Sequence, residues 1–235
     1  MAFIGDSYRE PGRVEVTYAL IFLNILSFYV VTFKMGANVV FPVGGVVPSE
    51  WFGASFSLAE QRPPEIISVL WSLFLHAGWM HLILNMLMLY LFGPNIEARL
   101  GRLNFLLFYL SCGSAGALFQ VIRNVESQVP IIGASGAIFG LMGGYFIFFK
   151  DHFFRVDFGK RAKRDLIFPV YIVILFFIII QVTQGLSPIQ SNSIEPVAYF
   201  AHMGGFVCGA FLAFMHPSRK AETNRPFRVF RGGKR

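Results

Sequence analysis

Charged residues are scarce in this chain of 235 residues, of which they make up only 14%, whereas they make up about 25% of an ordinary globular domain. Hydrophobic residues make up 55%, and 28 of the 235 residues are Phe. A water-soluble fold of this composition would have too few polar side chains to cover its surface. The composition therefore argues against a soluble domain and favours a membrane protein.

Metal-binding patterns are absent as well. The two cysteines, Cys112 and Cys208, lie in apolar segments and form no CxxC motif, and no HExxH motif occurs, so the sequence offers no metal-site pattern. We find no internal repeat of the kind that many transporters contain. A channel or transporter nevertheless stays open as an alternative at this point.

Six apolar segments are long enough to cross about 30 Å of hydrocarbon, which takes roughly 20 helical residues. The sequence thus predicts an all-α membrane protein, a bundle of six transmembrane helices within residues 16–216. A short segment at 1–15 precedes this bundle, and a basic tail at 217–235 follows it. The predicted spans are 16–33, 68–92, 103–122, 131–149, 167–186 and 196–216.

The basic residues are distributed unevenly between the predicted loops. Of the 20 Lys and Arg residues, 17 fall in the two termini and in the loops after the second and fourth spans. Because positive residues accumulate in cytoplasmic loops, we expect both termini in the cytoplasm, and a multi-pass protein of the plasma or bacterial inner membrane. Contact with anionic lipid explains the basic tail, so we expect no nucleic-acid partner.

Three polar side chains fall between the outer surface and the middle of the predicted bundle. They are Ser135, His81 and His202, each on a different span, and polar residues at such depth usually face a functional site. Simpler roles exist for each of them. A serine can bond to its own helix, a histidine can join two helices, and His76, His81 and His202 could together hold a haem or a metal.

Two further patterns support a site at this depth. His81 and Asn85 are four residues apart, so both project from one face of a helix. Small residues repeat every four positions on the fourth and sixth spans, which lets two helices approach at backbone distance. These residues are Gly136, Gly140, Gly205 and Gly209. Such an approach could bring Ser135 close to His202.

A serine hydroxyl becomes a good nucleophile when a base lies within hydrogen-bond reach of it. His202 is the candidate base for Ser135. The 13 acidic residues all fall in loops or at the ends of predicted spans. We therefore expect a Ser–His dyad without the buried carboxylate of a triad.

Three motifs together resemble the rhomboid intramembrane serine proteases. They are "HAGWMHLILN" from His76 to Asn85, "GASGAIFG" around Ser135 and "AHMGGFVCGA" around His202. They occur in the order of that family, on the second, fourth and sixth of six spans.

The resemblance implies an enzyme without cofactor or metal that cleaves transmembrane protein substrates within the lipid bilayer. It implies Ser135 as nucleophile, His202 as general base, and His81 and Asn85 in an oxyanion hole with the Ser135 backbone N–H. The segment "LFGPNIEARLG" matches a structural pair of the family, Glu97 and Arg99, which is expected to anchor the long first loop.

The chain also departs from the family pattern. Ile67 and Ser68 stand where many members have Trp-Arg, and Phe139 stands where some have Tyr. A phenyl ring can stack on the base but cannot donate a hydrogen bond. A catalytically inactive rhomboid-like binding protein is the alternative function, although such a protein would normally lack the serine or the histidine.

Overall fold

A computed structural model describes residues 3–6, 12–51, 65–157, 166–185 and 198–216. The predicted basic tail at 217–235 lies outside these residues. In chain order the elements are β1 (Phe3–Asp6), α1 (Glu15–Val30), the π-helix η1 (Val31–Met35), α2 (Ala37–Gly44), α3 (Pro48–Trp51), α4 (Glu65–Ser72), α5 (Trp79–Leu100), α6 (Arg102–Arg123), α7 (Ser135–Phe148), β2 (Phe153–Asp157), β3 (Leu166–Pro169), α8 (Val170–Gly185) and α9 (Tyr199–Met215).

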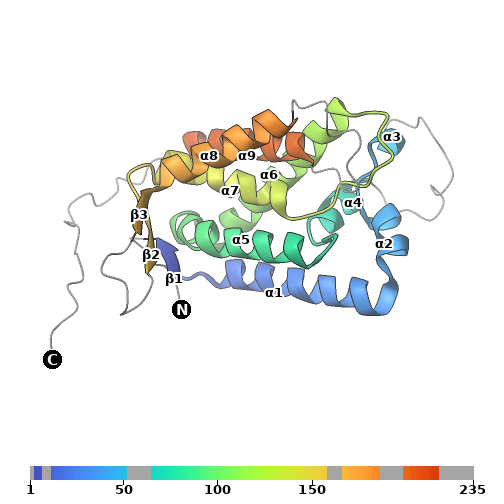
Figure 1. The fold of residues 1–235 in the computed structure, drawn as a ribbon, viewed down its shortest axis with the longest axis horizontal. Coiled ribbons are helices and arrows are strands. Elements are labelled where there is room, and N and C mark those ends of the chain that lie inside the picture. Colours follow the sequence, from blue (N-terminus) through green and yellow to red (C-terminus); the bar gives the residue numbers. More distant parts are fainter. Residues whose placement is uncertain (1–2, 7–11, 52–64, 158–165, 186–197, 217–235) are drawn as a thin grey trace.

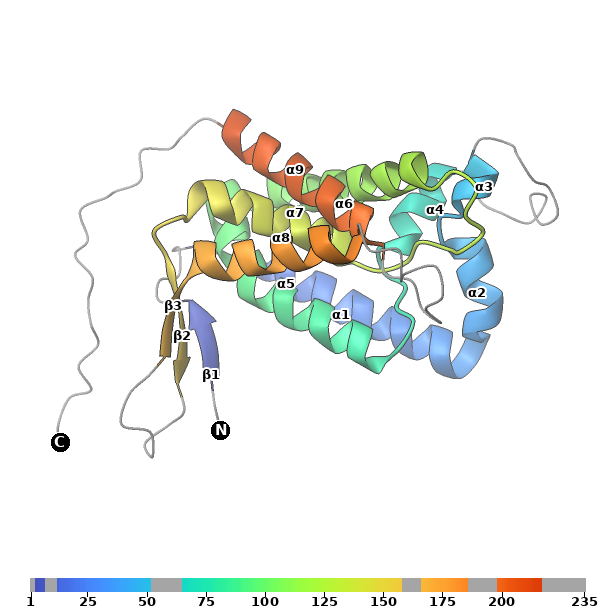
Figure 2. The same ribbon diagram turned by 45° about the horizontal axis from the view of Figure 1, so that its top comes forward.

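The long helices run side by side along the longest axis of the molecule (Figure 1). α9 packs against both α6 and α7, and α1 packs along α5. The strands lie at one end of the helices, and α2, α3 and α4 lie at the opposite end (Figure 2). The hydrophobic core runs between α5, α6 and α7 and includes Phe92, Tyr109 and Tyr145, all of which are fully buried.

Each of the six predicted spans overlaps an apolar helix, but the bounds and lengths of these helices differ from the prediction. Within the described residues, three are long and apolar enough to cross a membrane, namely Glu15–Met35, Trp79–Leu100 and Arg102–Arg123. The other three are shorter apolar helices: Ser135–Phe148, Val170–Thr183 and Tyr199–Met215. The protein is mostly helical, as expected, and the count of six membrane crossings stays a prediction.

The second predicted span is broken in the structure. The sequence predicts one helix over 68–92, but α4 ends at Ser72 and α5 begins only at Trp79. Gly78 precedes α5 with an extended backbone, at φ −168° and ψ 173°. Hydropathy measures the length of an apolar segment. It does not detect a turn within that segment when side chains of the turn are also buried. The break places His81 in the first turn of α5, whereas the sequence places it near the middle of a span.

α7 and α9 approach each other at backbone distance. A side chain at Gly205 would overlap the carbonyl oxygen of Gly136, and one at Gly209 would overlap the carbonyl oxygen of Gly140. The spacing of four residues puts both contacts on one face of each helix. Only residues without a side chain allow this approach, which holds the two helices in a fixed register.

Glu97 of α5 accepts hydrogen bonds from the start of α1. Its side chain is fully buried. One carboxylate oxygen accepts the backbone N–H of Val16 at 2.8 Å, and the other accepts the backbone N–H and the hydroxyl of Thr17, both at 2.7 Å. The first N–H groups of a helix have no partner within it, and a negative charge is favourable there. Glu97 therefore caps the N-terminus of α1.

The expectation that Glu97 and Arg99 anchor the first loop stays a prediction. Both oxygens of Glu97 bond to α1, and the guanidinium of Arg99 lies 4.7 Å from the ring centroid of Phe148 at the end of α7. The described part of the loop is held by backbone contacts. Val46 and Ile131 exchange two hydrogen bonds of 3.1 and 2.8 Å.

A three-stranded antiparallel sheet, in the order β1–β2–β3, corrects the all-α prediction. In its register Phe3 pairs with Asp157, and Phe154 pairs with Phe168. Strands of four or five residues carry little periodicity, and they form only where distant segments meet. The sheet ties the N-terminal segment to the loop between α7 and α8, so both lie at the same end of the bundle.

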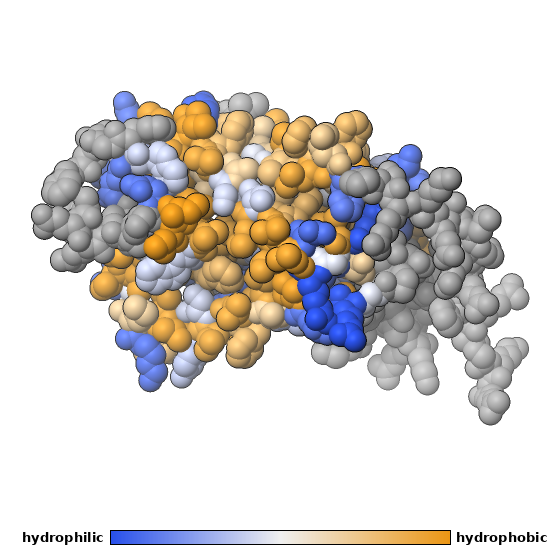
Figure 3. Space-filling view, turned by 180° about the vertical axis from the view of Figure 1, so that it is seen from behind, coloured by the Kyte–Doolittle hydropathy of each residue, from blue (hydrophilic) through white to orange (hydrophobic). Residues whose placement is uncertain are grey.

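Large apolar side chains are exposed around the outside of the helices, as in Phe22 (63% exposed), Leu103 (69%) and Phe211 (60%). On the face drawn in Figure 3, hydrophobic residues cover the middle and hydrophilic residues gather toward the two ends. Soluble monomers rarely expose apolar surface of this extent. This distribution suits helices that lie in a bilayer.

Candidate active site

The predicted site residues lie where three helices begin. Ser135 is the first residue of α7, and His81 and His202 lie in the first turns of α5 and α9. The sequence instead predicts Ser135 four residues inside a helix that starts at 131. The short stretch before α7 is extended and turn-like, and its apolar composition hides the true start.

Ser135 and His202 are in direct contact. The Nε2 atom of His202 lies 2.7 Å from the hydroxyl oxygen of Ser135, within the range in which a base can take the proton of a nucleophile. The two residues are 67 positions apart in the chain. Their contact follows from the close packing of α7 on α9. His202 is buried and Ser135 is half-buried.

Gly133 shapes the approach to the serine. Its φ is +119°, a conformation that residues with a side chain rarely adopt, and its N–H donates to the Ser72 carbonyl at 2.8 Å. A Cβ atom at this position would lie 2.8 Å from Nε2 of His81 and 3.7 Å from the hydroxyl oxygen of Ser135. The imidazole of His81 therefore lies beside the serine, with only a glycine between them.

His81 presents a donor on that side. Its Nδ1 accepts the backbone N–H of Ala77 through a long hydrogen bond of 3.4 Å. In a neutral imidazole one nitrogen accepts and the other carries the hydrogen. Nε2, the atom that faces Gly133, is thus the N–H donor.

Asn85 makes a hydrogen bond within its own helix. It is buried, and its side-chain nitrogen donates to the His81 carbonyl of the same helix at 2.9 Å. An amide nitrogen carries two N–H groups, and this bond uses one of them. The spacing of four residues between His81 and Asn85 suggested two parallel donors. The same spacing also permits this bond within the helix.

Phe139 packs flat on the imidazole of His202. The centroids of its ring and of the His202 imidazole are 4.4 Å apart, with an angle of 8° between the planes. Phe139 and Ser135 both belong to α7, four residues apart, and so share a face of that helix. The stacking that the family resemblance suggested for this position is present with a phenyl ring.

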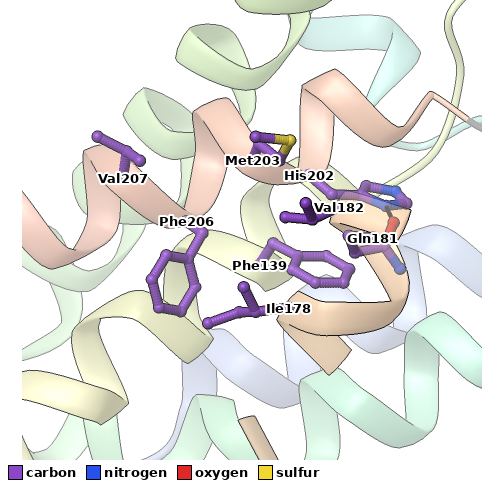
Figure 4. A pocket seen from close by; sticks show the side chains of 8 residues that line it. All are labelled: Phe139, Ile178, Gln181, Val182, His202, Met203, Phe206 and Val207. Carbon is purple, nitrogen blue, oxygen red and sulfur yellow. Dashed lines mark hydrogen bonds between the residues drawn. The ribbon is translucent and has the colours of Figure 1, made fainter. Parts of the chain in front are cut away.

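Gln181 of α8 is a site residue that sequence analysis missed. Its side-chain oxygen lies 2.6 Å from Nδ1 of His202, and both side chains are buried (Figure 4). The signal was present, because Gln181 is a polar residue within the uncharged apolar stretch of 166–194. Polar residues in such a stretch usually face a partner, but the sequence does not say which one.

An apolar cavity of about 100 Å³ adjoins His202 between α7, α8 and α9. In Figure 4 the side chains of His202 and Gln181 turn toward each other at one side of it, and Phe139 lies beneath them. The cavity is lined by Phe139, Ile178, Gln181, Val182, His202, Met203, Phe206 and Val207. None of these residues is acidic.

His76 packs against the site without joining the dyad. It is buried, and its ring meets that of His81 edge to face, with centroids 5.0 Å apart. Among the described residues, no group of three His, Cys, Asp or Glu side chains is arranged to hold a metal ion. In the described part of the chain, the haem or metal alternative for His76, His81 and His202 thus has no ligand set of three.

Comparison with known proteins identifies the family. A model described as the Rhomboid domain matches residues 63–219, which include the three motifs. YdcA of Bacillus subtilis, whose name describes it as a candidate rhomboid protease, is 32% identical over 148 residues, which are 62% of this chain and 65% of that protein. RHOMBOID-like protein 5 of Arabidopsis thaliana is 29% identical over 150 residues, 64% of this chain and 43% of that protein.

A third relative is Rhomboid protein 1, mitochondrial, of Saccharomyces cerevisiae. It is 29% identical over 175 residues, which are 72% of this chain and 46% of that protein. The chain thus spans between 43 and 65% of the length of these three relatives. The family match covers more than half of the chain, so the resemblance seen in the three motifs is confirmed, and the chain belongs to the rhomboid family of membrane proteins.

Proposed function

We propose that this protein is an intramembrane serine endopeptidase that hydrolyses peptide bonds in or near transmembrane segments of other membrane proteins. The observation that carries the proposal is the 2.7 Å contact between Nε2 of His202 and the hydroxyl of Ser135. Nucleophile and base come from different helices, and a structural serine has no need of such a partner. The chemistry below requires no cofactor and no metal.

In the first half of the reaction, His202 removes the hydroxyl proton of Ser135 through Nε2. The serine oxygen bonds to the scissile carbonyl carbon, and the carbonyl oxygen takes the negative charge. The imidazolium then gives the same proton to the leaving amine nitrogen, and the C–N bond breaks. This leaves an acyl group on Ser135 and neutral His202.

In the second half, water replaces the amine. His202 takes a proton from the water, whose oxygen attacks the acyl carbon. The imidazolium then returns the proton to the Ser135 oxygen as the new carboxylic acid leaves. Both halves require a base that keeps one acceptor nitrogen turned toward Ser135.

The developing oxyanion needs donors close to the attacked carbonyl. The Nε2–H of His81 lies beside Gly133, and the backbone N–H of Ser135 belongs to the first turn of α7, where N–H groups lack partners within the helix. Asn85 can add its second amide N–H. In a site of low dielectric constant, such donors are worth far more than in water.

The site favours an unwound substrate with a small side chain at the cleaved bond. The carbonyls of an intact helix are engaged in hydrogen bonds, so the segment must unwind before Ser135 can attack. Space beside the serine is narrow, since a single Cβ atom at Gly133 would lie 2.8 Å from His81. Unwound segments with Gly, Ala or Ser before the bond fit this space best.

The decisive experiment incubates the purified protein with a model transmembrane substrate. We expect cleavage by the wild type, and near-complete loss in Ser135→Ala, His202→Ala and the double variant alike, because nucleophile and base act as a unit. A serine-directed phosphonate probe should label the wild type at Ser135 and leave Ser135→Ala unlabelled. Near-normal cleavage by either single variant contradicts the proposal, and a folded wild type that neither cleaves nor reacts supports the inactive binding protein.

A further inference from the structure

We infer that Gln181 is a positioning residue, which sets the tautomer and orientation of His202. It extends the dyad to a Ser135–His202–Gln181 triad. The inference rests on the proposed function, and it adds a third participant from α8. Its basis is that both nitrogens of one imidazole are engaged at short distance. Nε2 lies 2.7 Å from the Ser135 hydroxyl, and Nδ1 lies 2.6 Å from the Gln181 oxygen.

The chemistry of the partners determines where the imidazole carries its hydrogen. The side-chain oxygen of Gln181 can only accept a hydrogen bond, so Nδ1 of His202 must donate. A neutral imidazole has one N–H, which leaves Nε2 as the acceptor that faces the Ser135 hydroxyl. This is the tautomer that a general base requires. Among the described residues, Gln181 supplies the acceptor at Nδ1 that favours this tautomer.

The contact should strengthen during the reaction. When His202 takes the serine proton it becomes an imidazolium, and its Nδ1–H then donates from a charged group, which makes a hydrogen bond shorter and stronger. Gln181 is 9% exposed and His202 is 7% exposed, so water can hardly replace the amide oxygen. Gln181 therefore stabilises the charged state of the base more than the neutral state.

A neutral amide suits this location better than a carboxylate does. No residue that lines the adjoining cavity is acidic, and a charged side chain inside the hydrocarbon is costly. Glutamine supplies the acceptor oxygen of a triad without the charge. Phe139 covers the face of the same ring, so the imidazole is held on its face and at both nitrogens.

The hydrogen bond from Gln181 also makes the orientation of the base depend on the position of α8. Ser135 and His202 are carried by α7 and α9, whose register is held by contacts between glycines. Gln181 comes from α8, which packs mainly along α9. The Nδ1 acceptor is therefore present only when α8 packs against His202.

Two readouts test the inference, and the first does not depend on activity. Nitrogen-15 NMR of histidine-labelled protein distinguishes the Nδ1–H tautomer from the Nε2–H tautomer, and the signal of His202 is identified by its loss in His202→Gln. We expect the Nδ1–H tautomer in the wild type, and a mixture in Gln181→Leu. An Nε2–H tautomer in the wild type, or an unchanged tautomer in Gln181→Leu, overturns the inference even if the protein is an active protease.

The second readout is the pH profile of kcat/KM for cleavage. Loss of a hydrogen bond to a charged group corresponds to a decrease of roughly 10- to 100-fold in Gln181→Leu, with the midpoint of the acidic limb moved to lower pH because the imidazolium is less stable. Gln181→Glu restores an acceptor. It should recover part of the rate and move the midpoint to higher pH, because a carboxylate stabilises the imidazolium.

The matched control is Thr183→Val on the same helix. The hydroxyl of Thr183 is exposed and bonds to the carbonyls of Ile179 and Ile180 in its own helix, so this variant should keep the wild-type rate and profile. Thermal stability identifies any variant that fails to fold, in which case Gln181→Glu carries the test. Equal rates and midpoints in the wild type, Gln181→Glu and folded Gln181→Leu overturn the inference. If the wild type itself does not cleave, the proposed function fails, and the NMR experiment still decides whether Gln181 sets the tautomer.

Discussion

The ring of Phe139 lies parallel to the imidazole of His202, with their centroids 4.4 Å apart and an angle of 8° between the planes. Phe139 comes from α7, the helix that begins at Ser135, and His202 comes from α9. One helix therefore carries both the serine and the surface on which its base rests. Any loosening of this stack would let the imidazole turn away from the serine.

The stack predicts a moderate catalytic role for Phe139. An aromatic pair is worth about 0.5–1.5 kcal/mol beyond burial, so Phe139→Leu should lower kcat/KM by roughly 2- to 10-fold. Phe139→Tyr should keep the activity. Phe146→Leu is the control, because it removes an aromatic pair of the same helix, Phe146 with Phe206, away from Ser135. Equal effects of the Phe139 and Phe146 leucine variants would contradict a role in holding the base.

Loss of His81 and loss of Asn85, the two proposed side-chain donors to the oxyanion, should lower the cleavage rate to different extents. Removal of one donor typically lowers the rate by about 10²–10³, and we expect this loss for His81→Ala. Asn85→Ala should cost less, since part of its amide serves the helix. Asn104→Ala is the control, because Asn104 on α6 also donates its side-chain N–H to the carbonyl four residues earlier, here that of Leu100 at the end of α5. Rates of cleavage and phosphonate labelling check this order, and wild-type rates in both site variants would make His81 and Asn85 purely structural.

Loss of the Glu97 side chain should affect the stability of the protein more than the chemical step of the reaction. Glu97→Ala removes three hydrogen bonds to a buried carboxylate. One such bond is worth about 1.5–3 kcal/mol and neighbouring bonds do not add in full, so we expect a loss of at least about 3 kcal/mol in the free energy of unfolding. Denaturation in detergent measures it. Glu15→Gln is the control: it breaks the exposed Glu15–Arg102 ion pair of 2.6 Å, which should cost under about 1 kcal/mol. Similar losses in the two variants would refute the capping role.

The glycine contacts predict an effect on the dyad through the backbone. In Gly205→Ala the new methyl group would overlap the Gly136 carbonyl, so α7 and α9 must separate and Ser135 must move away from His202. We expect lower stability and strongly reduced cleavage. Gly78→Ala is the control, since a Cβ atom there meets no neighbour within 4 Å and its extended backbone suits any residue. Wild-type activity in Gly205→Ala would show that the helices can separate without harm.

The orientation can be measured with cysteines introduced in a Cys208→Ala background, in which the remaining Cys112 is fully buried. Glu126→Cys lies in the exposed loop before α7, near the end where Ser135 sits, and Asp151→Cys lies in the exposed turn after α7. If the basic loops are cytoplasmic, an impermeant thiol reagent should label Glu126→Cys from outside intact cells and Asp151→Cys only after permeabilisation. The reverse pattern would invert the proposed topology.

The sequence by itself determined the apolar helices and the chemical identity of the site. Long uncharged runs need no knowledge of the fold to predict helices, because hydropathy and length are local properties. The glycine repeats predicted a close helix pair for the same reason, since spacing alone places small residues on one face. The glycine repeats favoured the pairing of Ser135 with His202 as a hypothesis, and the three motifs supplied the resemblance to the rhomboid family.

Only the tertiary structure decided which groups meet. It placed Ser135 and His81 at helix starts, joined Glu97 to Thr17 across 80 positions, and paired β1 with β2. It also brought the oxygen of Gln181 to the far nitrogen of His202. Hydropathy records how apolar a segment is, but a single polar residue within it selects its partner only when neighbouring helices have packed, because a hydrogen bond depends on position and direction in space.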